Sequence, residues 1–377
     1  MNKRVLIIVN GIENFFTHRL PLVRELKKQG YEVFLLAPSN KIDSRLKALE
    51  NDIKIVTLKF NRKSINPFSA IVSIIKCYRV FLEIKPDIIF NVAMKTSLYS
   101  SITCIFYRKA LNVNLITGLG YLFISQKKRV KVIRFFVKKC FKLSLSLSNS
   151  RMIFQNKDDM NLFLRESIVL KDRAFLVRGS GVDLNRYTPV PEPDDIHVLF
   201  SGRLLKDKGI EEFVEAAKIL ITKGIKAKFI LVGDVDPGNP STVKKETVLK
   251  WVQKGYVEWW GYYEDMASIL PKINIVCLPS YREGLPKILL EGAACQRALV
   301  TTNVPGCREV VEEGVNGLLV ELKDSVSLAE ALRTLITDHQ KRAQMASNAR
   351  NLVERDFSDL VIAKQTVNVF NAGHLKS

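Results

Sequence analysis

Short apolar runs alternate with amphipathic stretches from the beginning of the chain. The apolar runs predict buried strands at residues 4–9, 31–37, 53–58, 87–92 and 112–117. Helical periodicity predicts helices at residues 20–29, 44–50, 68–83 and 98–107. Strands that alternate with helices at intervals of roughly 25 residues predict a parallel, doubly wound α/β sheet.

The same alternation restarts after a segment of turn-forming residues. Runs at 152–155 and 174–177 close the first sheet, and glycines and prolines in residues 179–193 indicate a linker. Further strands are predicted at 197–201, 228–232, 257–260, 273–278, 298–301 and 317–320, with helices at 211–223, 243–254, 266–270, 324–338, 341–354 and 356–370. We therefore predict two doubly wound domains facing a cleft, residues 1–185 and 186–355, and a helical tail, 356–377, that crosses back to the first domain.

Charge is distributed unevenly between these two halves. Of the 58 Lys and Arg and the 38 Asp and Glu residues, 34 and 13 lie in residues 1–190, a balance of +21. Residues 191–377 carry 24 and 25, a balance of −1. A strongly basic half indicates a polyanionic partner, and nucleic acid and anionic lipid are both candidates.

One segment of the basic half combines cations with aromatic and aliphatic side chains. Residues 125–147 hold eight basic residues and no acidic one. This pattern favours a helix that lies on an anionic membrane surface; the alternative is a helix that packs an apolar stripe on the sheet and leaves its lysines in water. We expect membrane contact from Lys127, Lys128, Arg129, Lys131, Arg134, Phe135, Phe136, Lys138 and Lys139. Nucleic acid is not the expected partner, because no nucleic-acid-binding signature accompanies the charge.

No apolar run reaches the roughly 18 residues that a membrane-spanning helix needs. Six cysteines are scattered without a Cys-x-x-Cys pair, and no secretory signal precedes the first strand, which favours free thiols in a reducing compartment. We therefore expect a protein of a reducing compartment that has no membrane span.

Two glutamates follow the predicted strand at 273–278. Glu283 lies in a loop, and Glu291 lies in a helix that Pro286 can start, because proline suits the first helical position. Amides near Gly284 and Leu285 would lie at the helix N-terminus, where anions bind. Hydroxyl groups on both sides of a diphosphate, as in a nucleotide sugar, would suit this combination. The alternative is an ordinary surface loop with two solvated glutamates.

A second motif follows the first strand of the second half. Arg203 and Lys208 lie in the stretch from Gly202 to Gly209, at the carboxyl end of a strand, where open parallel sheets bind ligands. A guanidinium fork and an ammonium group together suit a diphosphate. Arg-x4-Lys alone is usually a surface turn, but here it lies at the same sheet edge as the two glutamates.

These motifs resemble glycosyltransferase family 4, the retaining enzymes with the GT-B fold. The resemblance covers nearly the whole chain and rests on 202–209, Leu-Val-Gly-Asp at 231–234, residues 278–291 and Pro-Gly-Cys-Arg-Glu at 305–309. It implies that Arg203 and Lys208 hold the donor diphosphate, that Glu291 binds the ribose and that Glu283 binds the transferred sugar. It also implies the remaining donor contacts, which are Gly11, Gly202, Gly233, Gly284, Leu285 and Pro286.

Asn66-Pro67-Phe68, residues 117–120 and the basic helix resemble bacterial enzymes that extend undecaprenyl-diphosphate-linked glycans from UDP-sugars, for O-antigen or other polysaccharides. Two departures from the family stand out. The first loop, Asn10-Gly11-Ile12, lacks paired glycines, and Met94 followed by Lys95 stands where relatives often have a histidine. His18 is nearby, and we interpret it as a residue at a helix start.

The resemblance implies transfer of an N-acetylhexosamine or hexose from a UDP-sugar to a membrane-lipid-linked saccharide. It also implies a peripheral protein at the cytoplasmic face of the inner membrane. No carboxylate is placed as an obvious nucleophile, so a same-face attack assisted by the leaving diphosphate is the expected route. Because no Asp-x-Asp motif lies in a suitable loop, we expect no metal or other cofactor. The alternatives are a UDP-sugar epimerase of the same fold and a non-catalytic sugar-nucleotide-binding protein at the membrane surface.

Overall fold

The computed structural model describes residues 2–38, 53–58, 67–119, 123 and 127–372. The predicted helix at 44–50 lies outside the described residues, as do Asn66 and Gly120 of the motifs above and the first two residues of the basic segment. The chain forms two compact units, Met1–Ser180 with Asp359–Ser377, and Gly181–Ser358. We call these unit 1 and unit 2.

Unit 1 is built on a parallel sheet with the strand order β3-β2-β1-β4-β5-β6-β7. Its strands are β1 Arg4–Ile8, β2 Glu32–Pro38, β3 Lys54–Leu58, β4 Ile88–Val92, β5 Leu111–Ile116, β6 Ser150–Phe154 and β7 Ala174–Leu176. Its α-helices are α1 Ile12–His18, α2 Leu20–Lys28, α4 Pro67–Ile84, α5 Met94–Phe106, α7 Lys128–Leu147, α8 Lys157–Arg165 and α14 Asp359–Asn371. Both faces of the sheet are covered, so its strands are almost continuously apolar.

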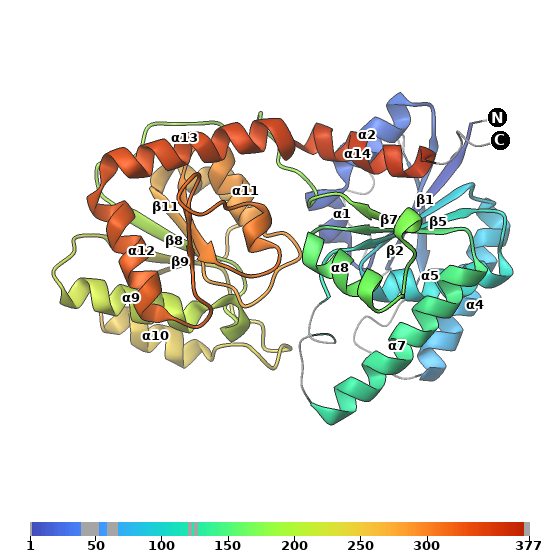
Figure 1. The fold of residues 1–377 in the computed structure, drawn as a ribbon, viewed down its shortest axis with the longest axis horizontal. Coiled ribbons are helices and arrows are strands. Elements are labelled where there is room, and N and C mark those ends of the chain that lie inside the picture. Colours follow the sequence, from blue (N-terminus) through green and yellow to red (C-terminus); the bar gives the residue numbers. More distant parts are fainter. Residues whose placement is uncertain (1, 39–52, 59–66, 120–122, 124–126, 373–377) are drawn as a thin grey trace. The chain divides into compact units, whose positions relative to one another are not determined.

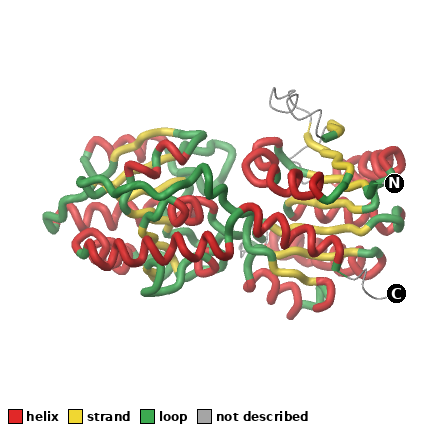
Figure 2. The backbone as a smooth tube through the Cα atoms, turned by 90° about the horizontal axis from the view of Figure 1, so that it is seen from above, coloured by secondary structure: helices red, strands yellow, loops and turns green. Residues whose placement is uncertain are grey.

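Alternation along each strand sends side chains to opposite faces of this sheet. Val5 and Ile7 of β1 pack in the cluster that includes α2 and α14, whereas Leu6 and Ile8 pack in the cluster that includes α4 and α5. Helices therefore lie on both sides of the strands, as the smooth trace of Figure 2 shows. This arrangement is the doubly wound α/β sheet that the sequence predicts.

The last helix of the chain belongs to unit 1. α14 packs beside α2 (Figure 1) and buries Val367 and Phe370 in the same cluster. The Tyr31 hydroxyl donates to Asn371 Oδ1 at 3.0 Å. Residues more than 300 positions apart in the chain thus complete one core, and the units meet in sequence at Ser180 and at Asp359.

Unit 2 repeats the architecture with a parallel sheet in the order β10-β9-β8-β11-β12-β13. Its strands are β8 His197–Ser201, β9 Lys228–Val232, β10 Glu258–Gly261, β11 Ile275–Leu278, β12 Ala298–Thr302 and β13 Leu318–Val320. Its α-helices are α9 Ile210–Thr222, α10 Lys245–Gln253, α11 Lys287–Ala294, α12 Ser325–Thr337 and α13 His339–Asp356. One large apolar cluster extends from Val182 to Phe357.

In both sheets the winding direction reverses at the first strand of the unit. In unit 1 the chain proceeds from β1 outward to β3 and then returns to place β4 on the other side of β1. In unit 2 the chain likewise proceeds from β8 outward to β10 and then returns to place β11 on the other side of β8. Loops that follow the two strands at such a switch point diverge and leave a crevice for ligands.

Three local expectations differ from the structure. The sequence predicts Pro286 as the first helical residue of the helix near residue 290. In the structure this helix begins at Lys287, one residue later, and Pro286 is its N-cap with an extended backbone. His18 ends α1 instead of starting a helix, and its Nδ1 lies 2.9 Å from Ser180 Oγ. The sequence analysis also missed α1 and α8, because both are short and largely polar.

Candidate active site

The switch point of unit 2 brings the two sequence motifs together. The loop after β8 runs through Gly202 to Gly209, and the loop after β11 runs through Pro279 to Pro286. Gly209 has φ +74° and lies so close to the second loop that a Cβ on it would be 2.0 Å from the Pro279 carbonyl oxygen. Only glycine tolerates both this backbone conformation and this approach, so Gly209 fixes the separation of the two loops.

Lys208 and Glu283 meet across these loops. Lys208 Nζ forms an ion pair with Glu283 Oε1, and the Ser280 hydroxyl donates to the same oxygen at 2.5 Å. The Glu283 side chain is 12% exposed and that of Lys208 25% exposed. The pair is therefore partly shielded from solvent. Charges in such a position are screened less by salt than charges at the open surface.

The loop that carries Glu283 packs closely against the Pro305–Gly306 turn. The Glu283 amide donates to the Pro305 carbonyl at 3.1 Å. Gly306 has φ +83°, and a Cβ on it would lie 2.5 Å from the Glu283 carbonyl oxygen. Beneath the loop, Cys307 is fully buried, and burial raises the pKa of its thiol to about 12. The thiol is therefore protonated at neutral pH and is a packing group.

Arg203 is on the solvent side of the same crevice. Its Nη1 lies 2.9 Å from Asp236 Oδ2, in an ion pair whose arginine is 59% exposed. The loop after β9 contains an Asp-x-Asp pair, Asp234 and Asp236, beside Arg203, although the sequence analysis expected no such motif in a suitable loop. Asp234 Oδ1 accepts a hydrogen bond from the amide of Val235 at 2.9 Å, and Asp236 Oδ2 accepts one from Arg203.

Glu291 is the most deeply buried carboxylate of the predicted set. It is the fifth residue of α11 and is 6% exposed. The Tyr187 hydroxyl donates to its Oε1 at 2.9 Å, and Lys287 Nζ lies 3.6 Å from that oxygen. Burial raises the pKa of Glu291, while Lys287 and Tyr187 act in the opposite direction. No sequence pattern pointed to Tyr187.

The remaining predicted donor residues lie at the edges of these loops or in unit 1. Gly202 donates to the Val232 carbonyl at 3.0 Å, and Gly233 donates to the Gly261 carbonyl at 2.7 Å, so both follow strands of the unit 2 sheet. Gly284, Leu285 and Pro286 connect Glu283 to α11. Gly11 belongs to unit 1, where it is the N-cap of α1 with an extended backbone.

The switch point of unit 1 holds the position where the sequence departs from its resemblance. Met94 begins α5, after Ala93 at φ +79°, and packs against the cluster around Phe154 and Phe163. Lys95 Nζ lies 5.7 Å from the centre of the Tyr99 ring, and burial lowers its pKa. A cation, rather than an imidazole, is thus the titratable group at the start of this helix.

Comparison with known families agrees with this arrangement. Residues 195–338 match the family described as glycosyl transferases group 1, and residues 4–156 match the family described as glycosyl transferase 4-like. The two matches fall on unit 2 and unit 1 respectively and together span most of the chain. The chain belongs to glycosyltransferase family 4.

Two characterised relatives of this glycosyltransferase come from bacteria. One is the N,N'-diacetylbacillosaminyl-diphospho-undecaprenol alpha-1,3-N-acetylgalactosaminyltransferase of Campylobacter jejuni, 28% identical over 89% of this chain and 90% of its own length. Another is the UDP-Gal:alpha-D-GlcNAc-diphosphoundecaprenol alpha-1,3-galactosyltransferase of Escherichia coli, 23% identical over 90% of this chain and 91% of its own length.

Solved structures establish the GT-B fold of the glycosyltransferase. Sucrose-phosphate synthase from Thermosynechococcus elongatus superposes with a TM-score of 0.81 over 98% of both chains at 18% identity. HepE from Anabaena, in complex with UDP and glucose, superposes with a TM-score of 0.77 over 98% of this chain and all of its own, at 19% identity. The prediction of two Rossmann-like domains in a GT-B enzyme is therefore confirmed.

The basic helix predicted to contact a membrane is α7, and its outer face is apolar as well as cationic. Val132, Phe135 and Phe136 are each more than half exposed. Lys128, Arg129, Lys131 and Lys139 are exposed beside them. We call these seven residues the apolar–basic surface. α4 also packs on α5, as α7 does, and it too has exposed apolar side chains, Ile71 and Ile75.

Two of the predicted membrane residues have contacts inside the protein. Lys138 donates to Glu166 Oε1 at 2.6 Å and lies 5.6 Å from the centre of the Phe123 ring. The Arg134 guanidinium lies 5.9 Å from the same ring. Both side chains are half-buried, so Lys138, whose charge is already paired, does not belong to the apolar–basic surface. Within the described part of the chain, no helix combines the length and the apolarity needed to cross a bilayer.

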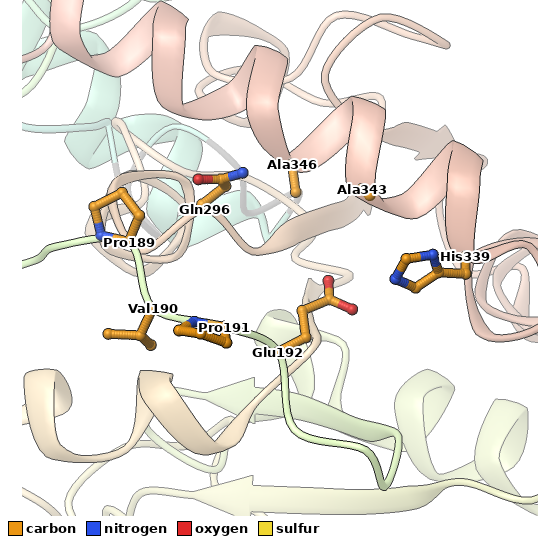
Figure 3. A pocket seen from close by; sticks show the side chains of 8 residues that line it. All are labelled: Pro189, Val190, Pro191, Glu192, Gln296, His339, Ala343 and Ala346. Atoms are coloured by element: carbon orange, nitrogen blue, oxygen red, sulfur yellow. The ribbon is translucent and has the colours of Figure 1, made fainter.

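A cavity of about 470 Å³ lies in unit 2, apart from the loops after β8 and β11. Pro189, Val190, Pro191 and Glu192 form one wall, and His339, Ala343 and Ala346 of α13 face them together with Gln296 (Figure 3). Its lining contains no residue of either sequence motif. The cavity marks where the chain that enters unit 2 crosses α13.

Proposed function

We propose that this glycosyltransferase transfers a hexose or N-acetylhexosamine from a UDP-sugar to an undecaprenyl-diphosphate-linked saccharide, with retention of anomeric configuration. The observation that carries the proposal is the meeting of Lys208 and Glu283 at the unit 2 switch point, with Arg203 on the solvent side. The named activities of the Campylobacter jejuni and Escherichia coli relatives support the lipid-linked acceptor, and that of the second supports a UDP donor.

The donor would bind by exchanging ion pairs. Its diphosphate replaces Asp236 at Arg203 and Glu283 at Lys208, because a diphosphate carries more negative charge than one carboxylate and its oxygens suit a guanidinium fork. Glu283, once released from Lys208, can accept hydrogen bonds from hydroxyl groups of the transferred sugar. Glu291 accepts the ribose hydroxyls. Arg203, Lys208, Glu283 and Glu291 then each keep a partner of opposite sign or a hydrogen-bond donor, and the displaced Asp236 carboxylate is left to solvent.

The chemical step needs stabilisation of the departing diphosphate more than it needs a nucleophilic side chain. Arg203 and Lys208 neutralise the charge that grows on the leaving group as the anomeric bond breaks. The acceptor hydroxyl approaches from the same face and passes its proton to that leaving group. Glu283 holds the sugar so that the acceptor oxygen is within reach. This route asks for no metal or other cofactor.

A membrane-bound acceptor requires the enzyme to come to the membrane. We propose peripheral attachment at the cytoplasmic face of the inner membrane through the apolar–basic surface. Shallow insertion of Phe135 and Phe136 would combine with attraction of the neighbouring lysines to anionic lipid. Nucleic acid offers the same charge but no apolar layer for the exposed phenylalanines, so lipid fits this surface better.

A substrate screen tests the proposed function. The protein is incubated with a panel of UDP-sugars and short lipid-diphosphate saccharides, and the products are separated by mass. We expect one UDP-sugar to add one residue to an acceptor, and the new linkage to keep the donor's anomeric configuration by NMR. Epimerisation of a UDP-sugar without acceptor, or binding of donors without any turnover, would contradict the proposal.

A further inference from the structure

Tyr187 reaches Glu291 from a segment that lies far from both sequence motifs. We call residues 187–193 the strap; they connect the start of unit 2 to β8. Tyr187 is 5% exposed and Glu291 is 6% exposed, and the hydroxyl of one donates to Oε1 of the other at 2.9 Å. Two buried polar groups this close form a bond that is costly to lose.

The strap is fixed at four points. Arg350 Nη1 donates to the Tyr187 carbonyl at 2.9 Å, and Arg297 Nη2 donates to the Val190 carbonyl at 2.9 Å. Glu192 forms an ion pair with Arg342 at 2.9 Å, and Asn274 Nδ2 donates to the Pro193 carbonyl at 3.0 Å. Figure 3 shows Pro189 to Glu192 running opposite the α13 residues that line the cavity. Tyr187 is therefore presented to Glu291 by a rigid support.

Charged and titratable groups surround Glu291 on several elements. Lys287 lies on its own helix, and Arg186, the neighbour of Tyr187, acts from the strap side while paired with Asp265 at 2.8 Å. Cys295, at the end of α11, is protonated at neutral pH because burial raises its pKa to about 11. Burial raises the pKa of Glu291, and Lys287 and the Tyr187 hydroxyl oppose that rise.

We propose that Tyr187 is a positioning residue, which orients the Glu291 carboxylate to accept hydrogen bonds from hydroxyl groups of the donor. The inference rests on the proposed function, in which Glu291 binds the ribose. A carboxylate has about four lone-pair positions, so the single phenolic donor leaves positions for ligand hydroxyls. Phenylalanine at this place would keep the ring packing and remove only the donor.

Kinetics of Tyr187→Phe test the inference. Donor KM and kcat are measured from about pH 5 to about pH 9, where a raised carboxyl pKa would appear in kcat/KM. We expect an approximately tenfold rise in donor KM at neutral pH, the scale of a lost hydrogen bond to a charged group, with kcat nearly unchanged. The acid limb of kcat/KM should move to higher pH, because the ionised carboxylate has lost a donor.

Two further variants make the result decisive. Tyr31→Phe makes the same substitution at a tyrosine of unit 1, where the hydroxyl donates to Asn371, and should leave the donor kinetics unchanged. Glu291→Gln should raise donor KM if the proposed function is right. A Tyr187→Phe variant with unshifted KM and acid limb, beside a weakened Glu291→Gln, would overturn the inference alone. An unchanged KM in Glu291→Gln would overturn the ribose assignment itself. Lower stability in Tyr187→Phe without a pH shift would show a purely structural tyrosine.

Discussion

At the scale of single residues, the site is assembled from ion pairs that substrate groups would displace. Arg203 is paired with Asp236 and Lys208 with Glu283. Ion pairs at exposed positions contribute roughly 0–1 kcal/mol, so breaking the Arg203 pair costs little. The positions of Arg203, Lys208 and Glu283 could be predicted because each follows a strand of recognisable apolar pattern. Asp236 and Tyr187 could not, since their roles depend on loop geometry that no periodicity encodes.

Replacing Asp236 tests the exchange of partners at Arg203. Asp236→Asn removes the competing carboxylate, so we expect donor KM to fall by about twofold to fivefold, the range of an exposed ion pair. Glu215→Gln is the matched control, because Glu215 is paired with Lys218 on α9 at 3.0 Å. Steady-state kinetics with varied donor measure the effect. A rise in donor KM for Asp236→Asn would show that Asp236 assists binding instead of competing with it.

Gly209 allows a test of the contact between the two loops. Gly209→Ala adds a Cβ 2.0 Å from the Pro279 carbonyl oxygen at φ +74°, which should cost about 1–3 kcal/mol of strain or more. Gly224 has φ +75° and nothing within 4 Å of a Cβ, so Gly224→Ala carries the backbone strain without the clash. Thermal unfolding should show a clearly lower midpoint for Gly209→Ala than for Gly224→Ala. Equal midpoints would mean that the loops adjust freely.

The buried carboxylate of Glu291 predicts a dependence of stability on pH. A carboxyl group whose folded pKa is raised contributes stability that is complete below its unfolded pKa, about 4.3, and is lost as pH rises through the folded pKa. Glu291→Gln removes that loss, so it should be at least as stable as wild type at neutral pH. Urea unfolding of both proteins at acidic and neutral pH measures this. A variant that loses more stability at neutral than at acidic pH would contradict the expectation.

At the scale of elements, apolar runs identified the strands of both sheets, since buried parallel strands are almost continuously hydrophobic. Helix boundaries were less accurate. α5 begins at Met94, four residues before the expected start, because the polar first turn hides its periodicity. α7 matched its expected range within the described residues, but the sequence did not reveal that Glu166 neutralises Lys138. An ion pair between separate helices requires knowledge of the fold.

Charge reversal on α7 tests the apolar–basic surface. A variant with Lys127, Lys128 and Lys131 all changed to Glu should bind anionic vesicles at least about a hundredfold more weakly. Each lysine near the membrane surface contributes about 1 kcal/mol of attraction, which the variant loses. The wild-type interaction should also weaken as salt rises. Flotation or cosedimentation with vesicles measures the binding.

The control for this experiment changes three exposed lysines elsewhere in unit 1, Lys28, Lys109 and Lys171, to Glu. The net charge change is the same, so a general electrostatic effect would release both variants alike. We expect the control to stay bound and the α7 variant to keep its activity on a water-soluble acceptor analogue. Equal binding of the α7 variant and wild type would contradict membrane contact and support the alternative, in which α7 packs on the protein and leaves its lysines in water.

At the scale of the whole molecule, the chain contains two sheets that share one winding rule. Each unit reverses direction beside its first strand, and the motifs that the sequence singled out follow the strands at the unit 2 reversal. That placement could be predicted from the order of strands and helices alone. The sequence predicts a helical tail that crosses back to the first domain, but no pattern in it identifies the side chains that α14 buries there, such as Phe370, which completes a core begun by the first strand.

The initial rate of glycosyl transfer by Arg203→Ala and Lys208→Ala, relative to wild type, tests the central claim most directly. Transfer is measured with the UDP-sugar and lipid-linked acceptor that the screen identifies, and circular dichroism confirms that the variants are folded. If the unit 2 switch point stabilises the leaving diphosphate, each variant should lose roughly 10²-fold or more of its turnover, the scale of one lost charge-stabilising group. Near-normal turnover in both folded variants would contradict the account.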